Sequence, residues 1–395
     1  MKRISYIAAL SLLLAACNPN SGVIGYPESP AGNNNGGGGG SNSGNGAQVV
    51  STIPADDDAD PNPQVTPNVV LPGITSSVTT EEGEVVIQLD MTGVMDPVTG
   101  EYLQLFGTNS SQQNVWVEVE GVPKGISVEN LSAQQGATTK ADLIFLVDNS
   151  GSMSEEADAI AEGILTWSNL LSQSGVDIKF GVVGYDGEIT GGLDVTDATT
   201  LSTFLDYSTG TYRTYHFEGN NAQTLAADAP NYYNGGGMDE CGMAAFHFAN
   251  DHFNFRSGAT RVYVNFTDEP NYYLGIDKFR TSWLLNNWQP YMGTIHNVYS
   301  DGVDAEQWAN ESEGSHDLPW KMAEYTGGTK LFVNSDFSGI TLSDLPVTGA
   351  LQNSYIIRFT NIDELIDGNT HEVTITIKTA DGNVAGVITL YITFS

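Results

Sequence analysis

The chain has few cysteines that could stabilise it covalently. Its 395 residues include only Cys17 and Cys241, which cannot form the framework of several disulfides that small exported domains use. The fold must therefore depend on apolar cores, and a hydrophobic content of 40% is enough to form them. A chain of this length has room for two or three domains. Small apolar neighbours predict that Cys241 is a buried hydrophobe and not a nucleophile.

Basic residues are also scarce. The chain has 14 lysines and arginines against 48 aspartates and glutamates, which gives a formal net charge of -34. Nucleic acids and anionic lipid surfaces bind to basic patches, so this balance argues against both as partners. It favours solubility and the attraction of divalent cations, although we expect most of these carboxylates to be solvated surface groups.

The motifs of the common enzyme classes are missing from the sequence. It contains no Gly-x-Ser-x-Gly, P-loop or His-Glu-x-x-His motif, and no Gly-x-Gly-x-x-Gly after a strand. His247 and His252 are five positions apart and lie among phenylalanines, which favours histidines at the edge of a core over zinc ligands. We therefore expect a protein that is not an enzyme.

No apolar run is long enough to span a membrane. Two basic residues precede an apolar stretch, residues 4–14, whose length suits a secretory signal and not a transmembrane helix. The sequence Leu-Ala-Ala-Cys that ends at Cys17 resembles a bacterial lipobox. This resemblance implies a signal peptide over residues 1–16 and acyl chains on Cys17 that anchor the protein to a membrane. An ordinary signal followed by a chance cysteine is the alternative.

The residue after this cysteine bears on location. In enterobacterial lipoproteins a residue other than aspartate at this position favours the outer membrane, and here the residue is Asn18. The predicted location is the bacterial cell envelope, with the chain attached to the outer membrane by its lipid anchor. The sequence leaves open whether the chain faces the periplasm or the outside.

A low-complexity segment separates the anchor from the rest of the chain. It covers residues 17–75 and combines asparagines and five consecutive glycines, residues 36–40, with an acidic, proline-rich end. This composition cannot form a packed core and predicts a disordered tether. A flexible chain of this length has a reach of roughly 40 Å, which is enough to hold a domain away from a bilayer.

Apolar and polar residues alternate with a period of two in two flanking segments. The alternation occurs in residues 76–140, as at 115–119, and again in residues 351–395, as at 388–394. It indicates half-buried strands. Neither segment alone has enough strands for a stable sandwich, so we expect a single β domain built from both ends of the chain. Two separate β units are the alternative.

Between these flanks, residues 141–350 alternate strand and helix. The expected strands cover residues 141–147, 176–185, 261–267, 293–299 and 329–333. The expected helices cover residues 155–171, 239–253, 277–287 and 318–325. This order predicts an α/β fold with a doubly wound, mostly parallel sheet, inserted in or flanked by the all-β domain.

Oxygen ligands follow the first of these strands. Residues 141–147 are largely apolar and should be buried on both faces, and Asp148, Ser150 and Ser152 come directly after them. Ligands of open α/β sheets bind beyond the carboxyl ends of the strands, where these side chains would emerge. One carboxylate and two hydroxyls suit Mg2+, Mn2+ or Ca2+ better than zinc. A turn closed by side-chain hydrogen bonds is the alternative.

This motif resembles the loop that opens the metal-ion-dependent adhesion site of the von Willebrand factor type A family. The resemblance implies two further loops. Asp268, followed by Glu269, matches the last of them. The middle loop normally has two glycines and a threonine before a helix, but here the glycines at 235–237 are followed by Met, Asp239 and Glu240.

The threonine is missing, so the residue that binds the ion in its place is not assigned by the motif. The resemblance suggests that Asp239 or Glu240 supplies an oxygen in its place. The alternative is a helix N-terminus, at which acidic residues interact favourably with the helix dipole. The family also carries a short antiparallel edge strand, for which residues 191–195 are the candidate.

The resemblance also implies how a partner would bind. In the family the serines and the threonine bind the ion directly, and one position stays open for a carboxylate of the partner. An acid in place of the threonine would retain the cation more strongly but repel an acidic ligand. We therefore expect a preference for Ca2+ or for a non-acidic partner.

The sequence thus predicts a membrane-anchored envelope protein that binds a protein or other surface ligand through Mg2+, Ca2+ or Mn2+. One alternative is an assembly scaffold of the envelope in which the metal only stabilises the domain. Another is a calcium-dependent accessory to an envelope enzyme or transporter.

Overall fold

The computed structural model describes residues 53–81, 83–130, 140–154, 156–172, 177–206, 217, 219–220, 223–233, 239–300, 315–334 and 346–394. All of them belong to one compact unit, Ser51–Ser395. The predicted signal peptide, the lipidated Cys17, the tether up to residue 52 and the glycines at 235–237 lie outside the described residues. Among the helices that are described, none is long and apolar enough to cross a membrane.

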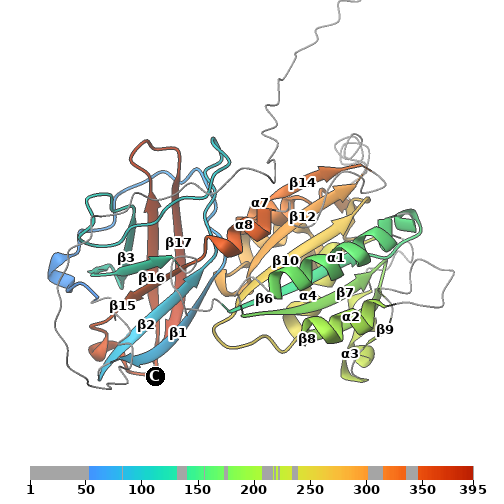
Figure 1. The fold of residues 1–395 in the computed structure, drawn as a ribbon, viewed down its shortest axis with the longest axis horizontal. Coiled ribbons are helices and arrows are strands. Elements are labelled where there is room, and N and C mark those ends of the chain that lie inside the picture. Colours follow the sequence, from blue (N-terminus) through green and yellow to red (C-terminus); the bar gives the residue numbers. More distant parts are fainter. Residues whose placement is uncertain are drawn as a thin grey trace, which may run out of the picture. The chain divides into compact units, whose positions relative to one another are not determined.

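Strands from both flanks of the chain pair in two antiparallel sheets, in which blue-to-teal and red strands lie together in Figure 1. The first sheet has the order β1-β2-β15-β5 and the second the order β17-β16-β3-β4. Their bounds are β1 Ile74–Glu81, β2 Glu84–Met91, β3 Val115–Val119, β4 Val122–Lys124, β5 Ser127–Asn130, β15 Tyr355–Phe359, β16 Thr370–Lys378 and β17 Ala385–Thr393. Because β15 lies between β2 and β5, and β16 lies between β17 and β3, each sheet needs strands from both flanks.

The alternating apolar residues of these strands meet in a shared core. Ile87 and Leu89 of β2, Val117 of β3, Ile357 of β15 and Ile375 of β16 are each at most 1% exposed and belong to one cluster. A period of two places every second side chain on the same face of a strand. Burial of these faces against each other is therefore what stabilises the pair of sheets.

A seven-stranded mixed sheet forms from the central part of the chain, in the order β14-β12-β10-β6-β7-β8-β9. Its strands are β6 Lys140–Asp148, β7 Asp177–Tyr185, β8 Ile189–Thr196, β9 Gly219–Asn220, β10 Thr260–Thr267, β12 Thr294–Ser300 and β14 Lys330–Val333. The strands β14, β12, β10, β6 and β7 run parallel, whereas β8 is antiparallel to β7. The carboxyl ends of the neighbours β6 and β10 therefore meet at one edge. Separately, β11 (Asn271–Tyr272) pairs with β13 (His316–Asp317).

Helices pack against both faces of β6. The α-helices are α1 Glu156–Ser172, α2 Ala198–Leu205, α3 Gln223–Asp228, α4 Gly242–His252, α5 Leu284–Asn287, α7 Lys321–Thr326 and α8 Pro346–Gln352. The 3-10 helices are η1 Asp56–Asp58, η3 Ser152–Ser154, η5 Ala229–Tyr232, η6 Asp277–Phe279, η7 Thr281–Trp283, η8 Pro290–Met292 and η10 Asp363–Leu365. Phe145 shares a core with Trp167 of α1, while the adjacent Ile144 shares another with Phe246 of α4. Successive strand residues point to opposite faces, so β6 is buried on both sides.

The prediction of a doubly wound, mostly parallel α/β fold is wrong for this chain. The antiparallel sheets of four, four and two strands together hold more strands than the seven-stranded sheet, which is itself mixed. Among the described residues, most helices other than α1 and α4 have eight residues or fewer, and the predicted helix at 277–287 is only η6, η7 and the four-residue α5. The predicted edge strand at 191–195 is β8, but β9 pairs beyond it. The strand and helix alternation at the centre outweighed the weaker signal of the half-buried strands in the flanks.

Residues 53–73, which the composition places in the tether, contact the second antiparallel sheet. The Lys124 ammonium donates a hydrogen bond of 2.9 Å to Asp56 Oδ2. The Asn68 N–H donates one of 2.8 Å to the carbonyl of Ala385. Leu71 is also buried in the core of the two antiparallel sheets, and Val69 packs against that core. The low overall hydrophobicity of the segment gives no sign of these contacts.

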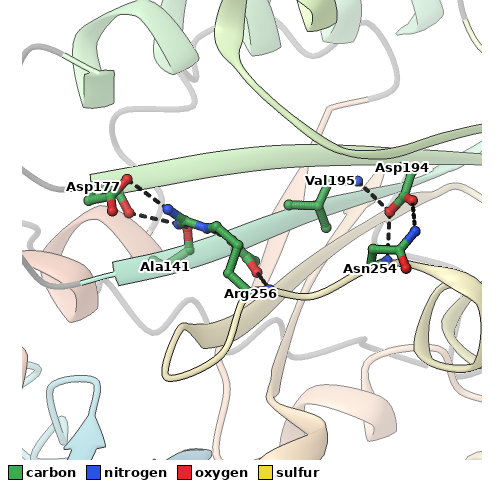
Figure 2. Close-up of polar contacts among 7 residues, drawn as sticks. Ala141, Asp177, Asp194, Val195, Asn254 and Arg256 are labelled. Atoms are coloured by element: carbon green, nitrogen blue, oxygen red, sulfur yellow. Dashed lines mark hydrogen bonds and ion pairs between the residues drawn. The ribbon is translucent and has the colours of Figure 1, made fainter.

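Arg256 fixes the starts of β6 and β7. Its Nε and its backbone N–H donate to the Asp142 carboxylate at 2.6 and 2.7 Å. Its Nη1 donates to Asp177 Oδ1 at 2.7 Å, and its Nη2 donates at 2.8 Å to the carbonyls of Ala141 and Asp177 (Figure 2). The Asp142 side chain is 0% exposed, so Arg256 supplies positive charge that this buried carboxylate requires.

Candidate metal site

The candidate site lies at the carboxyl ends of β6 and β10. The strand β6 ends at Asp148 and β10 ends at Thr267, and the register pairs Val147 with Phe266. Thr267 Oγ1 donates a hydrogen bond of 2.7 Å to Asp148 Oδ2, and the Ser150 N–H donates one of 2.9 Å to Asp148 Oδ1. These contacts fix both carboxylate oxygens of a side chain that is completely buried.

Two serine hydroxyls connect this loop to the loop after β10. Ser150 Oγ and Ser152 Oγ are 2.9 Å apart, and Ser152 Oγ donates to Asp268 Oδ1 at 3.0 Å. Tyr299 OH donates to the backbone carbonyl of Asp268 at 2.6 Å and so holds the second loop in place. The structure therefore brings Asp148, Ser150, Ser152 and Asp268 into one hydrogen-bonded group.

Further carboxylates lie close to this group. Burial raises the pKa of Asp148 to about 8, and the Asp268 carboxylate adds to the rise. Burial also raises the pKa of Glu240 to about 9, with Asp148 as the next cause. The pKa of Glu269 is raised to about 7 by burial and then by Asp268 and Asp239. Among the described residues, no lysine or arginine is a main cause of these three shifts, so the carboxyls of this region would repel one another if all of them were ionised.

The structure distinguishes the two acids that the sequence offers for the missing threonine. Glu240 is buried, the Asp148 carboxylate contributes to the rise of its pKa, and its carbonyl accepts a hydrogen bond of 2.8 Å from the Tyr272 N–H. Asp239 is partly exposed, and its charge acts on Glu269 and Tyr272 instead. Glu240 is therefore the acid whose pKa the Asp148 carboxylate raises. The glycines before it lie outside the described residues.

Two supporting residues are not apparent from the motifs. Thr267 is the last residue of β10 and holds Asp148 directly. Tyr185 is the last residue of β7 and pairs with Asp148 in the sheet, and its carbonyl accepts a hydrogen bond of 2.6 Å from the Asn149 N–H. Its hydroxyl donates to Asn265 Oδ1 at 2.8 Å, and burial raises its pKa. Aligning the ends of the predicted strands would have identified both residues.

The donors at this site are all oxygens. Among the described residues, no three or more histidine, cysteine, aspartate or glutamate side chains are grouped so that they could hold a metal ion. A cation here would have to combine the hydroxyls of Ser150 and Ser152 with the carboxylates of Asp148 and Asp268. Hard oxygen donors of this kind suit Mg2+, Ca2+ or Mn2+.

Cys241 and His247 belong to the core beside the site. Cys241 is fully buried, and burial raises the pKa of its thiol to about 12, so the thiol stays protonated as a small hydrophobe. His247 Nε2 lies 2.7 Å from the carbonyl of Lys278, and burial lowers the pKa of its imidazole. The predicted lipidation site, Cys17, lies outside the described residues.

Comparison with known proteins adds little. No family model and no curated protein matches this chain. The human COPII-coat protein Sec24c is 7% identical over 83% of this chain and 62% of its own, with a TM-score of 0.28. Proximal thread matrix protein 1 from the mussel byssus is 14% identical over 58% of this chain and 49% of its own, with a TM-score of 0.32. The chain thus spans less than two thirds of either protein, and both similarities are weak.

Proposed function

We propose that this chain is a lipid-anchored protein of the bacterial cell envelope that binds a protein or other surface ligand through a divalent cation. The observation that carries the proposal is the hydrogen-bonded group of Asp148, Ser150, Ser152 and Asp268. Four oxygen-bearing side chains from two loops converge at the carboxyl edge of adjacent parallel strands. The motif resembles the adhesion site of type A domains, and this resemblance implies that one coordination position of the ion stays open for the ligand.

The electrostatics of the site support a cation. Asp148 is buried, and a buried carboxylate is costly unless its charge is balanced. Its hydrogen-bond donors, Thr267 and Ser150, carry no charge, while its neighbours Asp268 and Glu240 are acidic. A divalent cation would take the place of protons on these carboxyls and so remove the repulsion between them.

Glu240 bears on the choice of ion and partner. Asp148 raises the pKa of the Glu240 carboxyl, so an ionised Glu240 would add negative charge beside the ion. This favours Ca2+, a cation that accepts several carboxylates in flexible geometry. The same charge weakens the attraction for an acidic ligand. The proposed partner therefore reaches the cation through a neutral oxygen and not through a carboxylate.

Removing the cation is expected to release the partner. The chain from residue 18 onward, which lacks the signal peptide and Cys17, should retain its partner from envelope extract in millimolar Mg2+ or Ca2+ when it is immobilised, and should lose it in EDTA. Asp148→Asn should fail to retain it in either condition. Asp277→Asn, which neutralises a side chain 94% exposed outside the site, should behave as the wild type. Equal retention in EDTA and by Asp148→Asn would show that the domain is a scaffold whose metal only stabilises it.

The anchor has its own test. Cys17→Ser should move the protein from the membrane fraction to the soluble fraction, because acylation at this single position supplies the membrane affinity. Fractionation with palmitate labelling measures the change. A variant that still sediments with membranes and still incorporates label would contradict the lipobox interpretation.

A further inference from the structure

A pocket of about 440 Å³ lies in the β part of the molecule, apart from the candidate metal site. It is formed by the hairpin of β3 and β4 and by the segment after β15, which includes η10. The residues that line it include Glu120, Val122, Lys124, Asp363, Glu364 and Leu365. The volume falls in the range of sites that hold small ligands or single side chains.

Lys124 gives the pocket a hydrogen-bond donor. Its side chain is 6% exposed, and its ammonium donates to Asp56 Oδ2 at 2.9 Å and to the carbonyl of Asn361 at 2.8 Å. An ammonium has three N–H donors. Among the described residues it has these two acceptors, so a third N–H can donate to an acceptor in the pocket that Lys124 lines. The carboxylate of Asp56 balances the charge of Lys124, so the lysine acts as a donor more than as a net positive charge.

The rim of the pocket is acidic. Asp363 and Glu364 are exposed on η10, and Glu120 lies at the turn between β3 and β4. Glu120 Oε1 is shared with the His371 imidazole, whose Nδ1 lies 3.3 Å away. Asp363 and Glu364 therefore give the rim of the pocket a net negative charge. Val122 and Leu365 add apolar surface beside them.

We propose that this pocket binds the N-terminal residue of a peptide. Such a residue carries a protonated amine for Asp363 and Glu364, a carbonyl oxygen for the third N–H of Lys124, and a side chain that can pack on Val122 and Leu365. An anionic ligand is repelled by the two rim carboxylates. A simple alkylamine leaves the buried Lys124 donor without an acceptor, which costs binding free energy.

Matched small probes test each element of this recognition. Leucinamide contains the amine, the carbonyl and an apolar side chain, and it should perturb NMR signals of the full chain around the β3–β4 hairpin with a Kd on the order of 1 mM. N-acetyl-leucinamide lacks the charge, and isoamylamine lacks the carbonyl. Each should bind at least about tenfold more weakly.

Variants of the rim complete the test. Asp363→Asn combined with Glu364→Gln should weaken leucinamide binding at least about tenfold, since both side chains are exposed and the fold should be kept. Asp277→Asn, a charge change on an exposed side chain elsewhere, should bind as the wild type. Equal binding of leucinamide and N-acetyl-leucinamide, unchanged binding by the rim variant, or no leucinamide binding at high millimolar concentration would each overturn the proposal. Binding of a neutral saccharide with no response to leucinamide would also overturn it, and would assign the pocket to polyols.

Discussion

Without divalent cations, the protein is expected to lose stability as the pH rises from about 4 to about 9, and a saturating divalent cation should abolish this loss. The carboxyls of Asp148 and Glu240 have ordinary pKa values of 3.8 and 4.5. Burial, together with neighbouring carboxylates, raises the pKa values in the folded chain to about 8 and about 9.

The direction follows from the protons that each state binds. Below the ordinary pKa values both carboxyls are protonated in the folded and the unfolded chain, so their contribution to stability is fully present. Between the ordinary and the raised pKa values only the unfolded chain releases its protons, so rising pH favours unfolding. The loss is complete above the raised values, where both states are ionised. Because the cation replaces these protons, its affinity should increase with pH over the same interval.

Calorimetric melting at about pH 5 and about pH 9, with EDTA or with millimolar Mg2+, Ca2+ or Mn2+, measures the effect. Asp148→Asn should show a smaller loss with pH in EDTA and no stabilisation by any cation. Glu240→Gln should weaken the cation's effect more than Asp239→Asn does, because Glu240 is buried and the Asp148 carboxylate acts on it. A metal-free melting temperature that rises over this interval, or a cation effect that persists in Asp148→Asn, would contradict the proposed site.

The sequence predicts the location of this candidate site but not its full composition. The apolar strand before Asp148 and the strand before Asp268 indicate two loops at one edge of a sheet, and the structure places these loops in contact. The choice between Asp239 and Glu240 could not be made from the sequence, because adjacent residues in a loop can point to different environments. Burial of Glu240 is a property of the packed chain.

The fold of the flanks was predicted less completely. Alternation identifies strands at 115–119 and 388–394, but it does not identify their partners, since pairing and register depend on residues far apart in the chain. The structure places β16 between β17 and β3, a contact that joins residues on either side of the whole central region. The segment at 53–73 was not predicted for a different reason. Its polar, proline-rich composition hides the few apolar residues, such as Leu71, that are buried against the sheets beside its hydrogen bonds.

Replacing Arg256 with methionine is expected to destabilise the fold by about 3–5 kcal/mol. The guanidinium and the backbone N–H of Arg256 bind both oxygens of Asp142, whose side chain is 0% exposed. Burial already raises the pKa of Asp142, although Arg256 acts against the rise. Methionine keeps much of the apolar volume of the arginine stem but leaves the buried carboxylate without its closest positive charge. Urea denaturation gives the change in the free energy of unfolding.

Two comparisons isolate the buried charge as the cause. Lys330→Met breaks an ion pair of 2.6 Å with Glu324 on the surface, and its cost should stay below about 1 kcal/mol. Adding Asp142→Asn to Arg256→Met should recover part of the lost stability, because a neutral amide is less costly to bury than a carboxylate. If Arg256→Met costs no more than Lys330→Met, or if Asp142→Asn deepens the loss, the buried ion pair does not hold β6 and β7 together. Asp142 and Asp177 lie near the starts of these strands, whereas Asp148 and Tyr185 end them, so the folded Arg256→Met protein should bind cations as the wild type does.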